Sequence, residues 1–143
     1  MGGFRSEAEF RRAFERIFEL MNETPAVGRA LRDARAPHRF VITDLGLEFH
    51  VDGEPPEKER EGRFLRWRWG DAPWKPVVTM HMASEVANRY FQGKENVAIA
   101  LALGRVKIAG PPATLLKLAP VTKPIHPLYR KWLEESGQRH LLA

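Results

Sequence analysis

The spacing of hydrophobic residues changes once along the chain, near residue 39, and this change constrains the fold more than any other feature. Before it, large apolar residues recur every three or four positions, as on one face of a helix: Phe10, Phe14, Ile17, Phe18 and Met21. After it, apolar residues alternate with polar or small ones, as in strands that are buried on one face: Phe40, Ile42, Leu45, Leu47, Phe49 and Val51. Helices that precede a run of strands favour an α+β fold over a repeated βαβ fold.

Two helices are expected before the change. Ser6-Glu7-Ala8-Glu9 has the spacing of a capping box, with Ser6 as the N-cap and the Glu9 side chain reaching back. Thr24-Pro25 restarts a helix, because proline is tolerated at the first helical position. This second helix should end by Ala36, ahead of Pro37. The apolar stripe of the first helix is interpreted as a surface that faces the core.

Four strands should follow. The first two are separated by a break near residues 44–46, and a charged loop then extends to Gly62. Residues 63–69 alternate so that Leu65, Trp67 and Trp69 share one face and Arg66 and Arg68 the other. The fourth strand, residues 77–82, is expected to lead into a short helix that is capped by Ser84 and ends at Gly93.

The segment 97–103 contains only Val, Ala, Ile and Leu and fits both a strand and a helix. Asn96 as N-cap and Gly104 as a stop favour the helix, in which Leu103 is in phase with Ile99 and should face the sheet. A fifth strand over 105–109 and helices over 113–119 and 128–135 complete the order. The fold class expected is α+β, a mostly antiparallel sheet with helices on one face.

Length and composition set the broad class. The 143 residues, 43% of them hydrophobic, fit a single domain over residues 1–143. The absence of cysteine excludes disulfides, thiolate metal sites and cysteine nucleophiles. No apolar run approaches the roughly 18 residues needed to span a bilayer, and residues 1–5 lack the core of a signal peptide. The chain is therefore expected to be cytoplasmic.

The charge is unevenly distributed. Residues 1–70 carry 13 basic and 13 acidic side chains, whereas residues 71–143 carry 10 basic and 5 acidic ones, so the net charge of +5 comes from the second part. Such a bias favours phosphate, anionic lipid or acyl-CoA, and it is also typical of an ordinary solvated surface.

No active site can be assembled from the motifs. The five histidines lack metal-ligand spacing, so neither a metal site nor a cofactor is predicted, and His50 and His81 should be solvated on outward strand faces. Ser84 is not in a nucleophile elbow, and phosphate-binding glycine loops are absent from the sequence. The chain is predicted not to be an enzyme.

Two clusters have binding potential. Arginine and tryptophan in residues 66–69 resemble a nucleic-acid surface, but alternation turns the tryptophans away from the arginines, which indicates core tryptophans and a solvated arginine face. The second cluster is a supply of long apolar side chains near the covered face of the sheet, including methionines, which suit adaptable binding surfaces. Composition alone favours a solid core over a cavity.

Several short motifs follow one another in a fixed order from residue 51 onward. The series includes Val51-Asp52-Gly53, the tryptophan-rich strand and residues 78–85. Its most telling members are Gly93-Lys94-Glu95-Asn96 and, some ten residues later, residues 104–110, which read Gly-Arg-Val-Lys-Ile-Ala-Gly. Together these motifs resemble the sterol carrier protein 2 family of small lipid-binding domains, and the resemblance covers roughly residues 39–120.

The resemblance implies a five-stranded sheet whose covering helices enclose an apolar tunnel, with no catalytic residues and no cofactor. The implied ligand is a fatty acid, a fatty acyl-CoA, a phospholipid or a sterol-like lipid, and a transient contact with a membrane surface is an expected partner interaction. Carried onto this sequence, the tunnel wall comprises Trp67, Met80, Met82, Phe91, Ile99, Leu103, Leu115 and Leu118. Basic residues that would meet a headgroup at its mouth are Lys94, Arg105, Lys107, Lys117 and Lys123.

Two alternatives remain open. The basic second part of the chain would suit a binding module for nucleic acid or an anionic membrane, which a steep salt dependence would reveal. The chain would also be consistent with an accessory domain that has a solid core and no ligand. The sequence names neither the lipid nor the oligomeric state.

Overall fold

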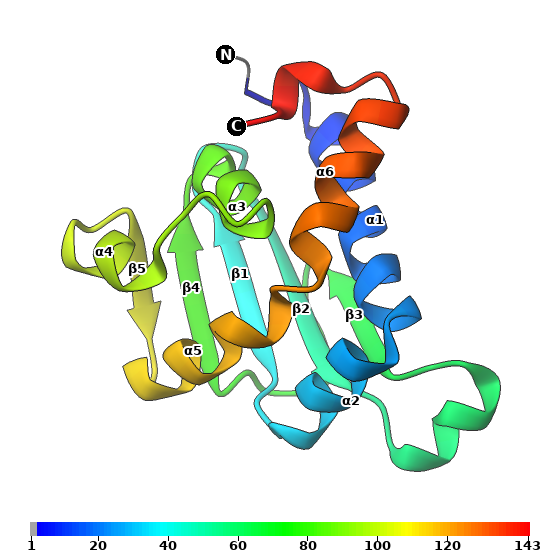
Figure 1. Cartoon of the computed structure of the whole chain (residues 1–143). Coiled ribbons are helices and arrows are strands. Elements are labelled where there is room, and N and C mark those ends of the chain that lie inside the picture. Colours follow the sequence, from blue (N-terminus) through cyan, green and yellow to red (C-terminus); the bar gives the residue numbers. More distant parts are fainter. Residues whose placement is uncertain (1–2) are drawn as a thin grey trace.

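Residues 3–143, the part of the chain that this computed structural model describes, form a five-stranded sheet covered by helices on one face (Figure 1). The strands are β1 (His38–Ile42), β2 (Leu47–Gly53), β3 (Leu65–Trp69), β4 (Val78–Met82) and β5 (Val106–Ala109). Their order across the sheet is β3-β2-β1-β4-β5. The pair β1–β4 is parallel and the other three pairs are antiparallel. The prediction of an α+β fold with a mostly antiparallel sheet is confirmed, and the parallel pair makes the sheet mixed.

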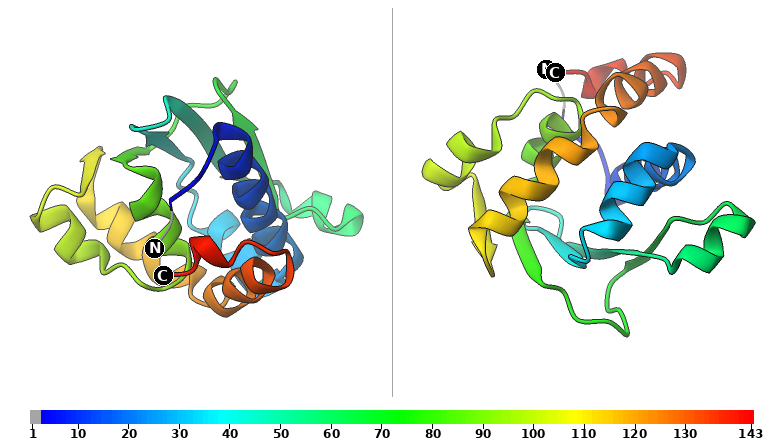
Figure 2. Two further views of the ribbon diagram at one scale, coloured as in Figure 1. Left: turned by 90° about the horizontal axis from the view of Figure 1, so that it is seen from above. Right: turned by 60° about the horizontal axis from the view of Figure 1, so that its bottom comes forward.

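The helices lie together over the inner face of the sheet, as two further views show (Figure 2). They are α1 (Glu7–Glu23), α2 (Pro25–Asp33), α3 (Ser84–Phe91), α4 (Val97–Ala102), α5 (Pro112–Leu118) and α6 (Ile125–Glu135). Three 3₁₀ helices lie between or after them: η1 (Pro56–Glu61), η2 (Ala119–Thr122) and η3 (Arg139–Leu141). Helices α1 and α2 cover the β2–β3 side, α4 contacts β5, and α6 packs against α1 and α3.

Local signals in the sequence explain where α1 begins and which face it buries. Ser6 Oγ accepts a hydrogen bond from Glu9 N at 3.1 Å, as the capping box predicts. Glu9 Oε1 instead accepts from Arg5 N at 2.7 Å, one residue earlier than in the standard motif. The whole apolar stripe of the helix is buried.

The connection from β3 to β4 covers part of the outer sheet face. His50 lies on that face as predicted, but it is only 4% exposed, so the expectation that it is solvated is wrong. Its Nδ1 lies 2.9 Å from Gly70 O, and its ring is edge-on to Trp74. Arg66 is also engaged: its Nη2 donates to Asp52 Oδ2 at 2.6 Å, and its guanidinium lies 4.1 Å from the Trp74 ring centroid. The arginine face is therefore only partly solvated.

Helix α3 begins differently from the prediction. Ser84 is its first residue, and the N-cap position is held by Ala83. Asp44, in the turn between β1 and β2, accepts hydrogen bonds from both Ser84 N (2.8 Å) and Ser84 Oγ (2.7 Å). A carboxylate from a distant turn thus replaces the local cap, because negative charge at a helix N-terminus is favourable.

The glycine that ends the motif 104–110 has a packing role. Gly110 has φ of 113°, and a Cβ atom there would lie 2.6 Å from Val77 O. The absence of a side chain therefore lets β5 approach the start of β4 closely. This close approach lies at the β4–β5 edge of the sheet.

Candidate functional site

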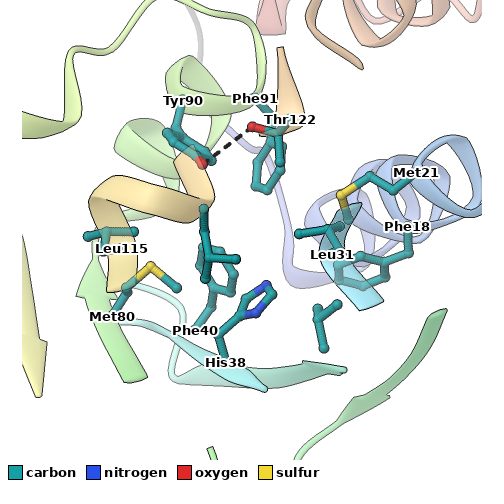
Figure 3. Close-up of a pocket in the computed structure, with 12 residues that line it drawn as sticks. Phe18, Met21, Leu31, His38, Phe40, Met80, Tyr90, Phe91, Leu115 and Thr122 are labelled. Carbon is teal, nitrogen blue, oxygen red and sulfur yellow. Dashed lines mark hydrogen bonds between the residues drawn. The ribbon is translucent and has the colours of Figure 1, made fainter. Parts of the chain in front are cut away.

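The space between the sheet and the helices contains two small apolar cavities, and Figure 3 shows the side chains that line the larger one. Their volumes are about 20 Å³ and 10 Å³, and they share the side chains of Phe40, Met80, Tyr90 and Leu115 as walls. The larger cavity is lined by Phe18, Met21, Leu31, His38, Phe40, Val51, Met80, Tyr90, Phe91, Leu115, Leu118 and Thr122. The smaller one is lined by Phe40, Met80, Met82, Val86, Tyr90, Glu95, Val97, Val106 and Leu115. The resemblance implied an apolar tunnel here, but in the part of the chain that the structure describes the space holds these two small cavities and no tunnel is seen.

Five of the eight side chains expected at the tunnel wall line these cavities: Met80, Met82, Phe91, Leu115 and Leu118. Strand β4 supplies the two methionines from its inner face, α3 supplies Phe91, and α5 supplies the two leucines. All five are at most 5% exposed. Three of the segments that the sequence placed around a binding space, β4, α3 and α5, therefore meet in one region.

Trp67 lies elsewhere on the inner face. Its Nε1 is 3.2 Å from both carboxylate oxygens of Glu15, and Trp69 Nε1 donates to Glu15 Oε1 at 2.7 Å. The ring packs against Phe18 at 5.5 Å between centroids. Trp67 thus belongs to the contact between α1 and β3, and two strands, β2 and β1, separate β3 from β4.

Ile99 and Leu103 are on the surface, 51% and 66% exposed, so the expectation that Leu103 faces the sheet is wrong. Asn96 caps α4 as predicted, accepting from Ile99 N at 3.0 Å. The residue that α4 turns inward is Ala100, which is fully buried. Val97 and Leu101 are partly buried against the core on the same side as Ala100, so Ile99 and Leu103 are left on the outer side.

The cavities also involve residues that the sequence did not single out, chiefly His38 and Phe40 on β1, Tyr90 on α3 and Thr122 in η2. Figure 3 shows His38 pointing into the larger cavity from below and Tyr90 meeting Thr122 at its opposite end. The alternation of β1 placed His38 and Phe40 on the same face as Met80, through the register of β1 and β4. The face that these residues share with Met80 is therefore the signal that could have identified His38 and Phe40 as cavity residues.

The polar groups at the larger cavity are few and uncharged. Burial lowers the pKa of His38, whose Nδ1 lies 3.0 Å from Ala36 O, so the imidazole is neutral at pH 7. Burial raises the pKa of Tyr90, and its hydroxyl lies 3.4 Å from Thr122 Oγ1. An apolar space with two or three polar groups at its ends suits a ligand that is mostly hydrocarbon.

A wider, open groove of about 610 Å³ borders the smaller cavity. The two hollows share Tyr90, Glu95 and Val97, and the groove continues to Lys123, His126 and Arg130. Of the five basic residues expected at a mouth, only Lys123 lines this groove. Arg105 instead donates to Glu95 Oε1 at 2.8 Å.

Other kinds of site find no support in the structure. Among residues 3–143, no three His, Cys, Asp or Glu side chains come close enough together to hold a metal ion. In the same part of the chain no helix is both long and apolar enough to cross a membrane.

Comparisons with solved structures show the fold. The chain matches sterol carrier protein 2 from Yarrowia lipolytica in its apo form, with a TM-score of 0.60 and 14% identity over 88% of this chain and 95% of that one. It matches sterol carrier protein domain 2 of Helicoverpa armigera with a TM-score of 0.54 and 17% identity, over 81% of this chain and 89% of that one.

A much larger protein contains the same fold. The inverting sec-alkylsulfatase Pisa1 from Pseudomonas sp. matches with a TM-score of 0.54 and 18% identity, over 66% of this chain but only 14% of that one. This chain therefore spans about one seventh of the sulfatase, which has a region of similar fold. No curated protein matches the chain.

A family model gives the identity that these structural likenesses leave open. The model of the SCP-2 sterol transfer family matches residues 14–123, well over half of the chain. The matched span includes all five strands, α2 to α5 and both apolar cavities. The chain belongs to the SCP-2 sterol transfer family.

Proposed function

We propose that this protein binds a lipid without chemically changing it, and transfers it, using the space between β1, β4, α3 and α5. Family membership supports lipid binding in general. The observation that carries the proposal is that two apolar cavities with a common wall lie beside an open groove, which shares Tyr90, Glu95 and Val97 with the smaller cavity. A hydrocarbon chain and a polar headgroup need such a pair of environments side by side.

The cavities must enlarge to accept a lipid. Sites for small ligands typically occupy about 300–1,000 Å³, against about 20 and 10 Å³ here. The wall contains Met80, Met82, Leu115 and Leu118, and methionine adapts readily because it is unbranched and has three rotatable bonds. These four side chains can rearrange at lower cost than the rings of Phe18, Phe40, Tyr90 and Phe91, which also line the cavities.

Helix α5 is the element that we expect to move. It follows Gly110 and Pro111, has only seven residues, and packs on the sheet through Leu115 and Leu118. Its Leu116 is 47% exposed. An outward displacement of α5 would join the two cavities, because Leu115 forms part of the wall between them.

A single flexible acyl chain is the ligand that fits best, as in a fatty acid or a fatty acyl-CoA. The shared wall of Phe40, Met80, Tyr90 and Leu115 divides the space into two narrow parts. A chain that bends can follow such a path with small side-chain shifts, whereas a rigid sterol would need a larger opening. Phospholipids and sterol-like ligands are outcomes that the experiment distinguishes.

The test uses purified, delipidated protein. Titration with cis-parinaric acid should show saturable binding at one site, and the fluorescent sterol dehydroergosterol should bind more weakly. Mass spectrometry of an extract from the protein before delipidation should show a bound lipid with an acyl chain. A protein that carries no lipid and binds neither probe would contradict the proposal and favour a solid core. Salt-sensitive binding of DNA or RNA instead of lipid would favour the nucleic-acid alternative.

We also propose that α4 contacts an anionic membrane when lipid is exchanged. From Val97 to Leu103 the chain has no polar side chain, and Ala98, Ile99, Ala102 and Leu103 are exposed. Exposed basic residues, Lys94 and Lys107, flank this apolar face. Apolar side chains that insert at an interface and cations that attract anionic lipid together suit a membrane surface.

Vesicle binding tests this contact. The double variant Ile99→Ser/Leu103→Ser should lose most of its co-sedimentation with phosphatidylglycerol vesicles, and its stability should change by no more than about 0.5 kcal/mol per site because both residues are exposed. Leu128→Ser is the matched control, since Leu128 is an exposed leucine on α6 (39%). Equal vesicle binding by wild type and the double variant would remove α4 from the proposal.

A further inference from the structure

The open groove beside the smaller cavity is lined by two basic side chains, Lys123 and Arg130, that have no acidic partner among the described residues. The charged or titratable groups that line it are Tyr90, Glu95, Lys123, His126 and Arg130. Within residues 3–143 no carboxylate lies within ion-pair distance of Lys123 or Arg130. Arg130 Nη1 donates to a neutral partner, the backbone oxygen of Gln92, at 3.2 Å.

Glu95, the one carboxylate among the described residues that line the groove, is already paired with two arginines. Glu95 has a side chain only 6% exposed, with Arg105 Nε at 2.8 Å and Arg89 Nη2 at 3.6 Å from its Oε1. Two arginines therefore offset its charge. The groove presents a net positive surface to any ligand that reaches it.

His126 is held tightly against the end of α3. Gly93 has φ of 76°, and a Cβ atom there would lie 2.7 Å from His126 Nδ1, so only glycine permits this approach. His126 Nε2 is buried and has no hydrogen-bond partner among the described residues. Burial lowers the pKa of His126, and the positive charges of Arg130 and Lys123 lower it further. Lys123 and Arg130 therefore act electrostatically on the imidazole of His126, with which they line the groove.

We infer that this groove binds the anionic headgroup, a phosphate or a carboxylate, of a lipid whose acyl chain lies in the adjoining cavities. Lys123 and Arg130 would hold the anion, and the wall formed by Tyr90, Glu95 and Val97 would separate head from chain. The inference rests on the proposed function, since the chain must bind in the cavities. It adds a charge requirement that the cavities alone do not impose.

The test compares three ligands that share a twelve-carbon chain: dodecyl phosphate, dodecanoate and uncharged 1-dodecanol. Affinities for the delipidated protein are measured by calorimetry below the ligands' micelle concentrations. In Lys123→Gln/Arg130→Gln, the affinity for dodecyl phosphate should fall at least tenfold and that for dodecanoate less, because a phosphate carries more charge. The affinity for 1-dodecanol should stay within twofold of wild type.

Two controls separate local from general effects. Lys131→Gln/Arg139→Gln also removes one exposed lysine and one exposed arginine, both outside the groove, and should leave all three affinities within twofold. Inorganic phosphate should bind wild type at least a hundredfold more weakly than dodecyl phosphate. In NMR titrations the pKa of His126 should rise when dodecyl phosphate is bound, and 1-dodecanol should leave it unchanged.

Several results would overturn the inference, and they do so in distinguishable ways. Equal losses of affinity for all three ligands would indicate that the groove binds their hydrocarbon chain and not their headgroup. Wild-type affinities in the double variant would place the headgroup elsewhere while the proposed function stands. Tight binding of inorganic phosphate would make the groove a site for a free anion. If wild type binds none of the ligands, the proposed function and the inference fail together.

Discussion

Helix α1 and helix α5 cover the same face of one sheet, and they do so with different kinds of side chain. Under α1, rings stack in sequence: Phe10 on Phe14 at 4.1 Å between centroids, Phe14 near Phe49 at 5.6 Å, and Phe49 on Phe40 at 4.7 Å. Under α5, the leucine and methionine side chains Met80, Met82, Leu115 and Leu118 line two cavities together with rings, among them Phe40, which ends the row of rings under α1. We call these the aromatic side and the cavity side.

The difference shows how one small core can be both stable and adaptable. Rings in stacked and edge-to-face contacts have few alternative arrangements, and each pair stabilises the fold by about 0.5–1.5 kcal/mol beyond its burial. Leucine and methionine exchange rotamers more easily, so the cavity side can rearrange while the aromatic side keeps the sheet in place. Stability and ligand binding are thus assigned to different parts of the same layer.

The largest expected effect is on the aromatic side. Phe14 is fully buried and contacts the rings of Phe10, Phe49 and Phe91. Phe14→Ala should lower the free energy of unfolding by about 3–5 kcal/mol, measured with urea on delipidated protein. Added fatty acid should stabilise Phe14→Ala no more than it stabilises the wild type. A loss below about 2 kcal/mol would show that the aromatic side is no more rigid than the cavity side.

A smaller effect is expected where α1 meets β3. Glu15 accepts hydrogen bonds from both Trp67 Nε1 and Trp69 Nε1, and Glu15→Ala leaves these two donors without their partner. The free energy of unfolding should fall by about 1–3 kcal/mol. Glu19→Ala on the same helix removes only an exposed ion pair with Arg16 and should cost at most about 1 kcal/mol. Equal losses in the two variants would remove the special role of Glu15.

The smallest effect concerns the pH dependence of the free energy of unfolding, through His38 on the cavity side. Burial lowers the pKa of His38 below 6.5, so below pH 6.5 the unfolded chain binds a proton that the folded chain does not. The free energy of unfolding therefore falls as the pH decreases, by at most about 1.4 kcal/mol per pH unit for this one group. His38→Asn, whose Nδ2 can replace the contact of Nδ1 with Ala36 O, should flatten the profile between pH 6.5 and 5.5. A profile parallel to that of wild type would contradict this.

Local signals predicted the fold well because they act within a few residues. Ser6 and Asn96 cap the helices that they were expected to cap, and the alternation of β3 gave the inward face of Trp67 correctly. Alternation states which face a side chain occupies but not which part of that face. Trp67 therefore lies on the aromatic side, although it was expected at the lipid site.

Contacts between distant segments explain the remaining errors. The burial of His50 depends on the connection that crosses the outer face, and the cap of α3 depends on Asp44. The inward side of α4 depends on how closely β5 approaches it, which no pattern in residues 97–103 reveals. The spacing of Lys123, His126 and Arg130, by three and then four residues, did contain a signal for the groove, because such residues share one face of a helix.

The most direct test of lipid binding on the cavity side is to introduce a tryptophan on each side, in separate variants, and to measure the affinity of each variant for a lipid. Leu115 lines both cavities, and Ile17 is fully buried on α1 outside them. We predict that Leu115→Trp lowers the affinity for cis-parinaric acid at least tenfold and costs less than about 1 kcal/mol of stability. Ile17→Trp should cost about 1–3 kcal/mol, as overpacking does, and leave the affinity of the folded protein unchanged. Unchanged binding in Leu115→Trp, or loss of binding only in Ile17→Trp, would contradict the account.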